Sequence, residues 1–395
     1  MEKCNVKEYA PGIYILSHEA ADIWVAQNLN QKDVDYYYGG TRTVSHMFNN
    51  EETYNITNYL EKYESGMKNT LINNAINEGI FESMSEELPE GFIGSYVGGG
   101  RCVIHPKNEE NEKILMDPKN EKHKELVDSI FKNLGSFLNT KSGKIKLTPD
   151  FGRFAGLADM LHNHTNNVLG IACEEGGCGG KASYTSTGIV QVAKSLGVEN
   201  DKTVPITLIG SAGACGEGVL NYFLANDYTD IMVCDVWYDS EEGKNEKERL
   251  MQLGVKYTPA KKGKFTDECL SRGGFIICTT IGGELINSNV EIINDGTKLL
   301  LAHNEAIPVG NEGIDYIESI VKDKDVLIIP GQMLTFGGAL TSRIEWFWRV
   351  NNKGEYFNKK LAHDTVSVAA DYWTKKIVAS DDKNIYRKMY NDFAV

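Results

Sequence analysis

The sequence lacks an excess of basic charge and any long hydrophobic run. Its 41 lysines and arginines face 55 aspartates and glutamates, which gives a net charge of −14. No basic cluster interleaved with aromatic residues occurs, so we expect no nucleic-acid partner. No stretch of about 18 apolar residues occurs, and the first ten residues contain no apolar signal region. These absences predict a cytoplasmic protein that does not interact with membranes.

Paired cysteines are also lacking. The 8 cysteines are scattered, and no two have C-x-x-C spacing. Several lie in apolar runs such as IMVCDV (231–236) and FIICTT (275–280), a pattern typical of buried, reduced thiols. His162 and His164 could ligate zinc, but no third ligand stands at a suitable spacing. The sequence therefore predicts no metal site.

Length and apolar pattern predict an α/β protein of two domains. A chain of 395 residues is too long for one ordinary core, and 41% hydrophobic residues can fill two. Residues 1–165 mix helical and strand-like stretches and predict an α/β domain. Residues 170–344 alternate short apolar strands with helices, which predicts a Rossmann-type, doubly wound parallel sheet. We expect residues 345–395 to form helices that return to the first domain.

The stretch VPITLIGSAGACGEG (204–218) has the strongest chemical signal. In a glycine-bearing turn between a strand and a helix, main-chain N–H groups can approach a pyrophosphate. Gly213 and Gly216 hold the second and third positions of G-x-G-x-x-G, and Ser211 occupies the first. Asp235 ends the next predicted strand, where a carboxylate would bind an adenosine ribose, so the pattern favours dinucleotide binding over a structural turn. No Lys or Arg directly follows Asp235 to receive a 2′-phosphate, so we expect NAD rather than NADP.

Six short stretches, in order along most of the chain, carry a family resemblance. They are YYGGTRTV (37–44), VGGGRCVI (97–104), LTPDFG (147–152), KASYTSTGIVQVAKSLG (181–197), LLAHNEAIP (300–308) and LIIPGQMLTFGGAL (327–340). Together they resemble the glutamate/leucine/phenylalanine/valine dehydrogenases, most closely the shorter, leucine-dehydrogenase-like branch. The resemblance implies an NAD-dependent amino-acid dehydrogenase that forms a homo-oligomer, with its substrate and oligomer contacts in the first domain.

The resemblance also assigns roles to individual residues. Asp150 would be the proton-handling carboxylate beside the substrate. Gly39 and Gly40 would let the carboxylate end of the substrate approach the first domain. Thr185 and Asn304 would border the nicotinamide. The remaining cofactor-binding residues would be those of the glycine turn and the strand after it, Ser211, Gly213, Gly216 and Asp235.

Arg101 departs from the family pattern. In the family, a lysine after the three glycines activates the water that adds to an imine, and here that position is Arg101. A guanidinium stays protonated, so it can clamp a carboxylate but cannot act as a general base near neutral pH. We therefore expect Arg101 to bind an anionic group of the substrate, and the hydrolytic half of deamination is put in doubt.

The second lysine of the family is replaced as well. Thr70 stands at its position, and Lys68 lies two residues earlier, roughly 200° around a helix. An alignment gap would restore Lys68 as a catalytic candidate. Lys181, shortly before Thr185, could supply an amine to the site, or it could be a surface lysine in a glycine-rich loop.

Two classes of function follow from these patterns. The first is an NAD-dependent oxidoreductase that moves hydride between the nicotinamide and the α-carbon of an amino or imino acid. Within it, the resemblance predicts deamination, whereas the missing lysines favour a variant such as reduction of a preformed imine. The alternative is a non-catalytic or sensory dinucleotide-binding protein. The presence of Asp150, Thr185, Asn304 and Asp235 favours the enzyme.

Overall fold

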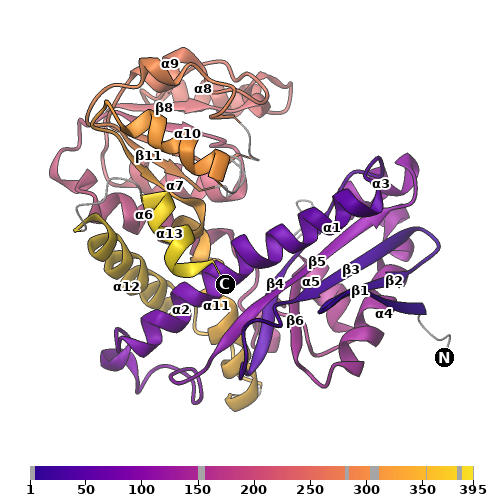
Figure 1. Ribbon diagram of the computed structural model, residues 1–395. Coiled ribbons are helices and arrows are strands. Elements are labelled where there is room, and N and C mark those ends of the chain that lie inside the picture. The colour runs from indigo at the N-terminus through magenta and orange to yellow at the C-terminus, as the bar shows by residue number, and fades with distance from the viewer. Residues whose placement is uncertain are drawn as a thin grey trace. The chain divides into compact units, whose positions relative to one another are not determined.

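The chain is organised as two compact α/β units. The computed structural model describes residues 5–149, 156–280, 284–302, 311–352, 354–379 and 385–394. The first unit comprises Met1–Lys181, Ala339–Ala362 and Phe393–Val395, and the second comprises Ala182–Gly338 and His363–Asp392. Figure 1 shows that each unit contains a sheet covered by helices. The domain boundaries given by the sequence stay a prediction.

The first unit is built on a mixed sheet with the strand order β1-β2-β3-β5-β4-β6. Its strands β1 to β3 and β5 pair antiparallel, whereas β4 runs parallel to both β5 and β6. The carboxyl ends of β4, β5 and β6 therefore lie at one edge of the sheet. The strands are β1 (Asn5–Ala10), β2 (Ile13–Ser17), β3 (Ala21–Gln27), β4 (Tyr36–Thr43), β5 (Val97–Pro106) and β6 (Ile145–Pro149).

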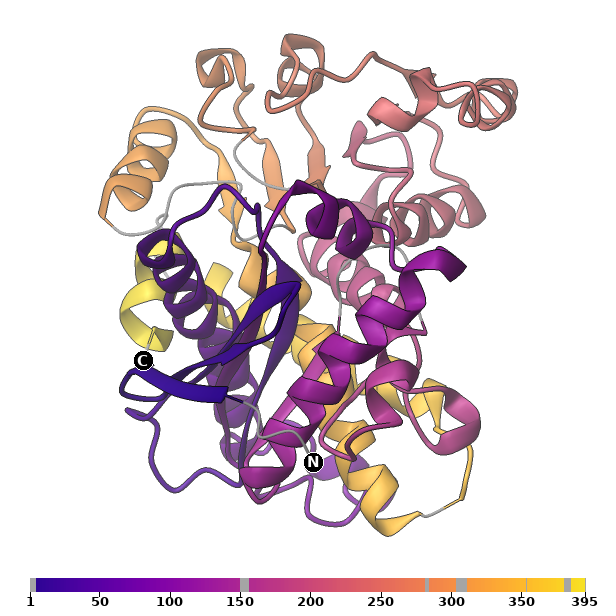
Figure 2. The same cartoon turned by 90° about the vertical axis from the view of Figure 1, so that its right-hand side faces the viewer.

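Helices cover both faces of this sheet. On one face, Ile130, Phe131 and Leu134 of α4 pack into a core with Val25 and Ile104. The other face is covered by α1, the π-helical η1 and α2, which follow one another along the sheet, and by the later part of α11 (Figures 1 and 2). The helices of this unit are α1 (Asn50–Tyr59), η1 (Leu60–Gly66), α2 (Met67–Asn77), α3 (Glu109–Met116), α4 (Lys124–Thr140), α5 (Leu157–His162) and α11 (Gly331–Asn351), the last beginning in the second unit.

The second unit contains an all-parallel sheet with the order β12-β11-β10-β7-β8-β9. Strands β7, β8 and β10 are buried at every position, as expected for a parallel sheet covered on both faces. This is the strand order of a Rossmann fold, so the predicted fold class is confirmed. The strands are β7 (Ile206–Ile209), β8 (Ile231–Cys234), β9 (Lys256–Tyr257), β10 (Phe275–Cys278), β11 (Lys298–Leu301) and β12 (Leu327–Ile329).

Apart from the start of α11, seven described helices lie in or enter the second unit. They are α6 (Ala182–Ser195), α7 (Ala214–Ala225), α8 (Lys244–Gln252), α9 (Asp267–Ser271), α10 (Asn311–Val321), α12 (Lys359–Val378) and α13 (Ile385–Phe393). Helices α6 and α7 approach closely, because a Cβ atom at Gly218 would lie 2.4 Å from Ser186 Oγ.

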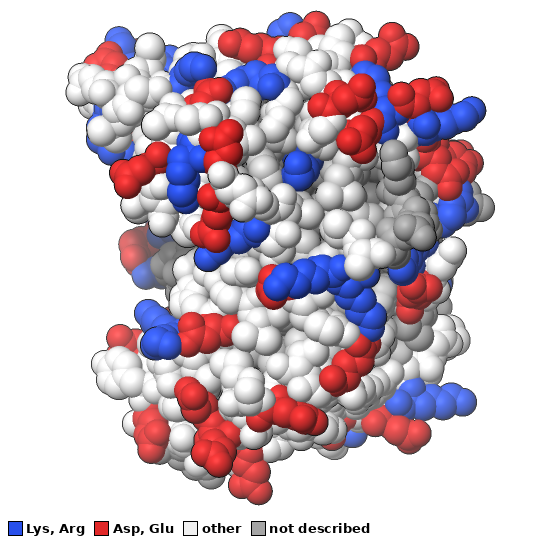
Figure 3. Space-filling view, turned by 90° about the vertical axis from the view of Figure 1, so that its left-hand side faces the viewer, with Lys and Arg blue, Asp and Glu red and all other residues white. Residues whose placement is uncertain are grey.

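The surface carries both signs of charge. Figure 3 shows acidic and basic side chains intermingled on the face that it draws, without a large area of one sign. None of the helices in the described part of the chain is both long and apolar enough to cross a membrane.

Candidate substrate and dinucleotide sites

Three neighbouring strands of the first unit bring Arg101, Gly40 and Thr148 into one row. Gly40 on β4 lies opposite Thr148 on β6. The register that aligns Thr41 with Cys102 places Arg101 of β5 on the other side of Gly40. Residues opposite each other project to the same face, and neighbouring strands are about 4.8 Å apart. The Cα atoms of Arg101 and Thr148 are therefore roughly 10 Å apart, with a residue that has no side chain between them.

The glycines of this sheet allow η1 to approach closely. A Cβ atom at Gly39 would lie 1.6 Å from the carbonyl oxygen of Gly100 and 2.6 Å from Ser65 Oγ. A Cβ atom at Gly99 would lie 2.6 Å from Oε1 of Glu61. Only glycine fits at these two positions, because β5 and η1 exclude a side chain at Gly39 and η1 excludes one at Gly99. A role of Gly39 and Gly40 in admitting a substrate stays a prediction.

Arg101 and Lys68 bind the same carboxylate. Nη1 of Arg101 lies 3.2 Å from Oε2 of Glu64, and Nζ of Lys68 lies 3.1 Å from Oε1. Burial opposes the ionisation of Glu64, but Arg101, Lys68 and Arg42 outweigh it and hold the pKa of this carboxyl well below its usual range. Arg101 itself is 4% exposed, and its Nε atom has no hydrogen-bond partner among the described residues. Three cations, Arg101, Lys68 and Arg42, therefore act on the single carboxylate of Glu64.

Lys181 is half-buried among hydroxyl groups of the first unit. Its Nζ donates to the hydroxyl of Tyr38, at 2.5 Å, and to Oγ1 of Thr148. The Tyr38 hydroxyl donates to Ser342 Oγ at 2.8 Å and lies 3.0 Å from Thr148 Oγ1. Burial lowers the pKa of Lys181, but Tyr38 and Cys178 more than offset this effect and raise the pKa above its ordinary value. Lys181 is therefore a fixed cation at neutral pH.

Two of the predicted site residues lie outside the described residues. They are Asp150, which follows Pro149 at the end of β6, and Asn304. Thr185 lies in the first turn of α6 and is half-buried.

In the second unit, the turn before α7 contains one closely packed glycine, Gly216, and one with free space beside it, Gly213. A Cβ atom at Gly216 would lie 2.2 Å from the carbonyl oxygen of Gly210, so the turn and α7 need glycine there. A Cβ atom at Gly213 would meet only this same oxygen, at 3.4 Å, and would otherwise face open space. Gly213 is also the N-cap of α7 and provides no side-chain cap, which leaves the first N–H groups of the helix for a ligand.

Asp235 and Ser211 hold this turn in place through hydrogen bonds. The Asp235 carboxylate accepts from the N–H of Ala212 at 3.0 Å and from the N–H of Trp237 at 2.9 Å. Ser211 is 1% exposed, and its hydroxyl donates to the hydroxyl of Tyr238 at 3.3 Å. Each carboxylate oxygen can accept a further hydrogen bond, so Asp235 can hold the turn and still bind a ribose.

Metal ligation has no support in the described part of the chain, where no group of three or more His, Cys, Asp and Glu residues could hold an ion. His162 instead lies 3.5 Å from Glu175, and His164 lies 2.8 Å from Asp128.

Sequence reasoning missed the hydroxyl partners of Lys181. Tyr38 stands directly before the Gly-Gly pair that was singled out, so its position was a usable signal. Ser342 comes from α11, far along the chain, and no local pattern links it to β4. Glu64 was missed because nothing in the sequence indicates a π-helix, whose wider turn faces β5.

Comparison with known proteins shows which class of fold this chain has. The sequence matches no family profile and no curated protein. Among solved structures, it is similar to L-tryptophan dehydrogenase from Nostoc punctiforme, with 15% identity and a TM-score of 0.61 over 100% of this chain and 95% of that one. It is also similar to glutamate dehydrogenase from Plasmodium falciparum, with 12% identity and a TM-score of 0.62 over 98% of this chain and 78% of that one. A third similar structure is glutamate dehydrogenase from Peptoniphilus asaccharolyticus. Its sequence identity is 14% and its TM-score is 0.55, and the match covers 95% of this chain and 84% of that one.

These structures belong to the glutamate/leucine/phenylalanine/valine dehydrogenase family, so the predicted resemblance is confirmed at the level of the fold. The chain has the two-domain α/β fold of amino-acid dehydrogenases, including the Rossmann-type domain.

Proposed function

We propose that this protein is an NAD-dependent oxidoreductase of the amino-acid dehydrogenase type. It would move hydride between the nicotinamide and the α-carbon of an amino or imino acid. The observation that carries the proposal is the row of Arg101, Gly40 and Thr148, with Lys181 bound to Thr148, on the strand that ends directly before Asp150. We also propose a cytoplasmic homo-oligomer, as the resemblance implies.

In this proposal, the first unit binds the substrate through its cations. Arg101 has N–H donors beyond the one that faces Glu64, and a guanidinium fork suits a carboxylate. Lys181 adds a second positive charge on the other side of Gly40. Asp150 would move the proton of the substrate amine. An amino-acid carboxylate is the ligand that this distribution of charge fits.

The second unit would bind the cofactor at the turn before α7. Gly213 is open enough for a pyrophosphate to approach the main chain, and Asp235 has lone pairs left for the ribose. NAD supplies the redox chemistry when bound. Thr185 and Asn304 would orient the nicotinamide.

The particular reaction we propose is one that needs no activated water, such as reduction of a preformed imine or oxidation that stops at the imine. Arg101 and Lys181 are both cations at neutral pH, and Lys68 is held by Glu64. None of these three groups is a free base that could take a proton from water. Ordinary deamination would need a base from elsewhere in the chain.

The test is NAD(H) turnover, followed by absorbance, with a panel of L-amino acids and, in reverse, with 2-oxo acids plus ammonia or with cyclic imines. We expect the Asp150→Asn variant to lose at least about a hundredfold in kcat, because general acid–base catalysis contributes this much. Asp323→Asn, an exposed carboxylate, is the matched control and should behave like the wild type.

The outcomes separate the candidates. Turnover of preformed imines without turnover of 2-oxo acids plus ammonia supports the variant reaction, and turnover of both supports deamination. NADH binding without any turnover would leave the sensory protein, which the open position at Gly213 also allows.

A further inference from the structure

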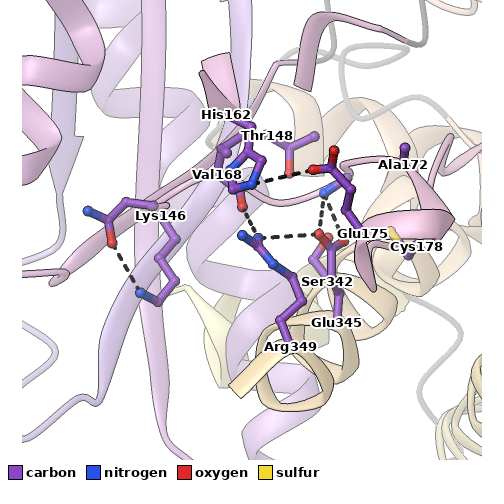
Figure 4. A network of polar contacts seen from close by, with 12 residues as sticks. Lys146, Thr148, His162, Val168, Ala172, Glu175, Cys178, Ser342, Glu345 and Arg349 are labelled. Carbon is purple, nitrogen blue, oxygen red and sulfur yellow. Dashed lines mark hydrogen bonds and ion pairs between the residues drawn. The ribbon is translucent and has the colours of Figure 1, made fainter. Parts of the chain in front are cut away.

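A fully buried carboxylate holds the loop that leads to Lys181. Glu345 of α11 is 0% exposed, and its two oxygens accept from the N–H of Gly170 at 2.9 and 2.8 Å. Arg349, one turn later, lies 3.7 Å from Glu345 and donates to the carbonyl oxygen of Val168 at 2.6 Å. Figure 4 shows both side chains projecting from α11 toward this loop. One helix thus fixes the backbone of residues 168–170.

The position of Gly170 affects Thr148 and Lys181 of the candidate site, because Gly170 packs against both. Its φ of +94° is a conformation that favours glycine. A Cβ atom there would lie 3.3 Å from Cγ2 of Thr148 and 3.4 Å from Cε of Lys181. Gly170 therefore packs against both the lysine side chain and its hydroxyl partner, so a shift of this residue displaces the amine.

Cys178 anchors the other end of the loop. Its side chain is 1% exposed, and burial together with the negative charge of Glu345 raises the pKa of the thiol well above its usual value. The thiol therefore keeps its proton, and it donates to the carbonyl oxygen of Gly179 at 3.5 Å. Only Gly179 and Gly180 separate Cys178 from Lys181, and two glycines alone cannot define where a side chain points.

We infer that Glu345 is a positioning residue for Lys181: it holds Gly170, which packs against the lysine side chain, and so fixes the amine against Tyr38 and Thr148. This inference rests on the proposed function for its catalytic meaning. Glu345 itself touches no reacting group in the proposal.

Charge gives Glu345 a second effect on Lys181. Tyr38 and Cys178 raise the pKa of Lys181, and the negative charge of Glu345 adds a smaller contribution in the same direction. A purely structural anchor would not change the titration of Lys181. Removing the charge while keeping the shape of the side chain separates the two roles.

The experiment compares Glu345→Gln with the wild type in two measurements. The first is the pH dependence of Lys181 acetylation by acetic anhydride, read by peptide mass spectrometry. The second is the pH profile of kcat/KM with a substrate from the panel above. We expect Lys181 to titrate at lower pH in the variant and kcat/KM to fall roughly tenfold to a hundredfold, the cost of a misplaced group. Glu355→Gln, an exposed carboxylate after the same helix, is the control.

A second pair of variants guards against misfolding of Glu345→Gln. Cys178→Ser keeps a donor for the Gly179 carbonyl and should retain the Lys181 titration and kcat/KM, whereas Cys178→Ala removes this donor from the loop and should lower both. An unchanged Lys181 titration in Glu345→Gln and Cys178→Ala overturns the inference. If the wild type turns over no substrate, the proposed function fails, and the acetylation measurement alone decides whether Glu345 positions Lys181.

Discussion

Two glutamates of η1 have opposite protonation preferences. Burial raises the pKa of Glu61 to about 8, and a hydrogen bond from Asn28 opposes this only in part. The Oε1 atom of Glu61 has no partner among the described residues. Glu64, in the same segment, is held ionised by Arg101 and Lys68. The difference comes from the cations: Arg101, Lys68 and Arg42 outweigh the burial of Glu64, whereas Lys62 does not outweigh the burial of Glu61.

Glutamine substitutions at these positions should have opposite effects on stability. Between pH 4.5 and about 8 the unfolded chain loses the Glu61 proton while the folded chain keeps it, so wild-type stability falls as pH rises. Glu61→Gln removes this loss and should stabilise the protein at pH 8.5 by up to about 3 kcal/mol, with little effect at pH 4.5. Urea unfolding at both pH values measures it, and equal effects at both would contradict it.

Glu64→Gln provides the matched comparison. The ionised Glu64 stabilises the fold above pH 4.5, and this contribution is lost as pH falls below that value. The substitution leaves the buried Arg101 and the half-buried Lys68 without their carboxylate and should cost about 3 kcal/mol at neutral pH. The same urea series checks the sign, since this variant should be the less stable one at pH 7.

At the scale of elements, packing requires glycine at one position of the β7–α7 turn, and at a second position we propose that glycine faces the cofactor. Gly216 packs 2.2 Å from the Gly210 carbonyl at the Cβ position, whereas Gly213 has room there. Gly216→Ala should therefore destabilise the second unit by about 1–3 kcal/mol through overpacking. Gly213→Ala should leave the melting temperature nearly unchanged and weaken NADH binding at least about tenfold, by titration of NADH fluorescence. The reverse pattern would remove this turn as the dinucleotide site.

The same two units show which parts of a structure local sequence can specify. The second sheet and its turn were predictable, because each strand, glycine and acidic residue lies within a short stretch. The surroundings of Lys181 were not, since its partners come from β4 and β6, and the loop before it is held by α11. Arg101 was expected to bind an anion, and its partner Glu64 depends on a π-helix that no sequence pattern indicated.

At the scale of the whole molecule, the division into two compact units predicts where a cofactor acts. A ligand stabilises the structure that binds it, by about 2.7 kcal/mol at a concentration of 100 Kd. NADH should therefore slow hydrogen exchange in peptides of β7 and β8 and in the start of α7. Peptides of β2 and β3 in the first unit serve as the internal control. Slower exchange confined to the first unit would contradict the assignment of the cofactor to the second.

Gly39 also limits how this chain can change over time. Its missing side chain is required by Gly100 on the neighbouring strand and by Ser65 on η1, whatever else it contacts. An alanine at position 39 would fit only if β5 and η1 both moved away from it at the same time. Replacement of Gly39 by a larger residue in a single step is therefore closed, and change in this part of the sheet has to begin at its neighbours.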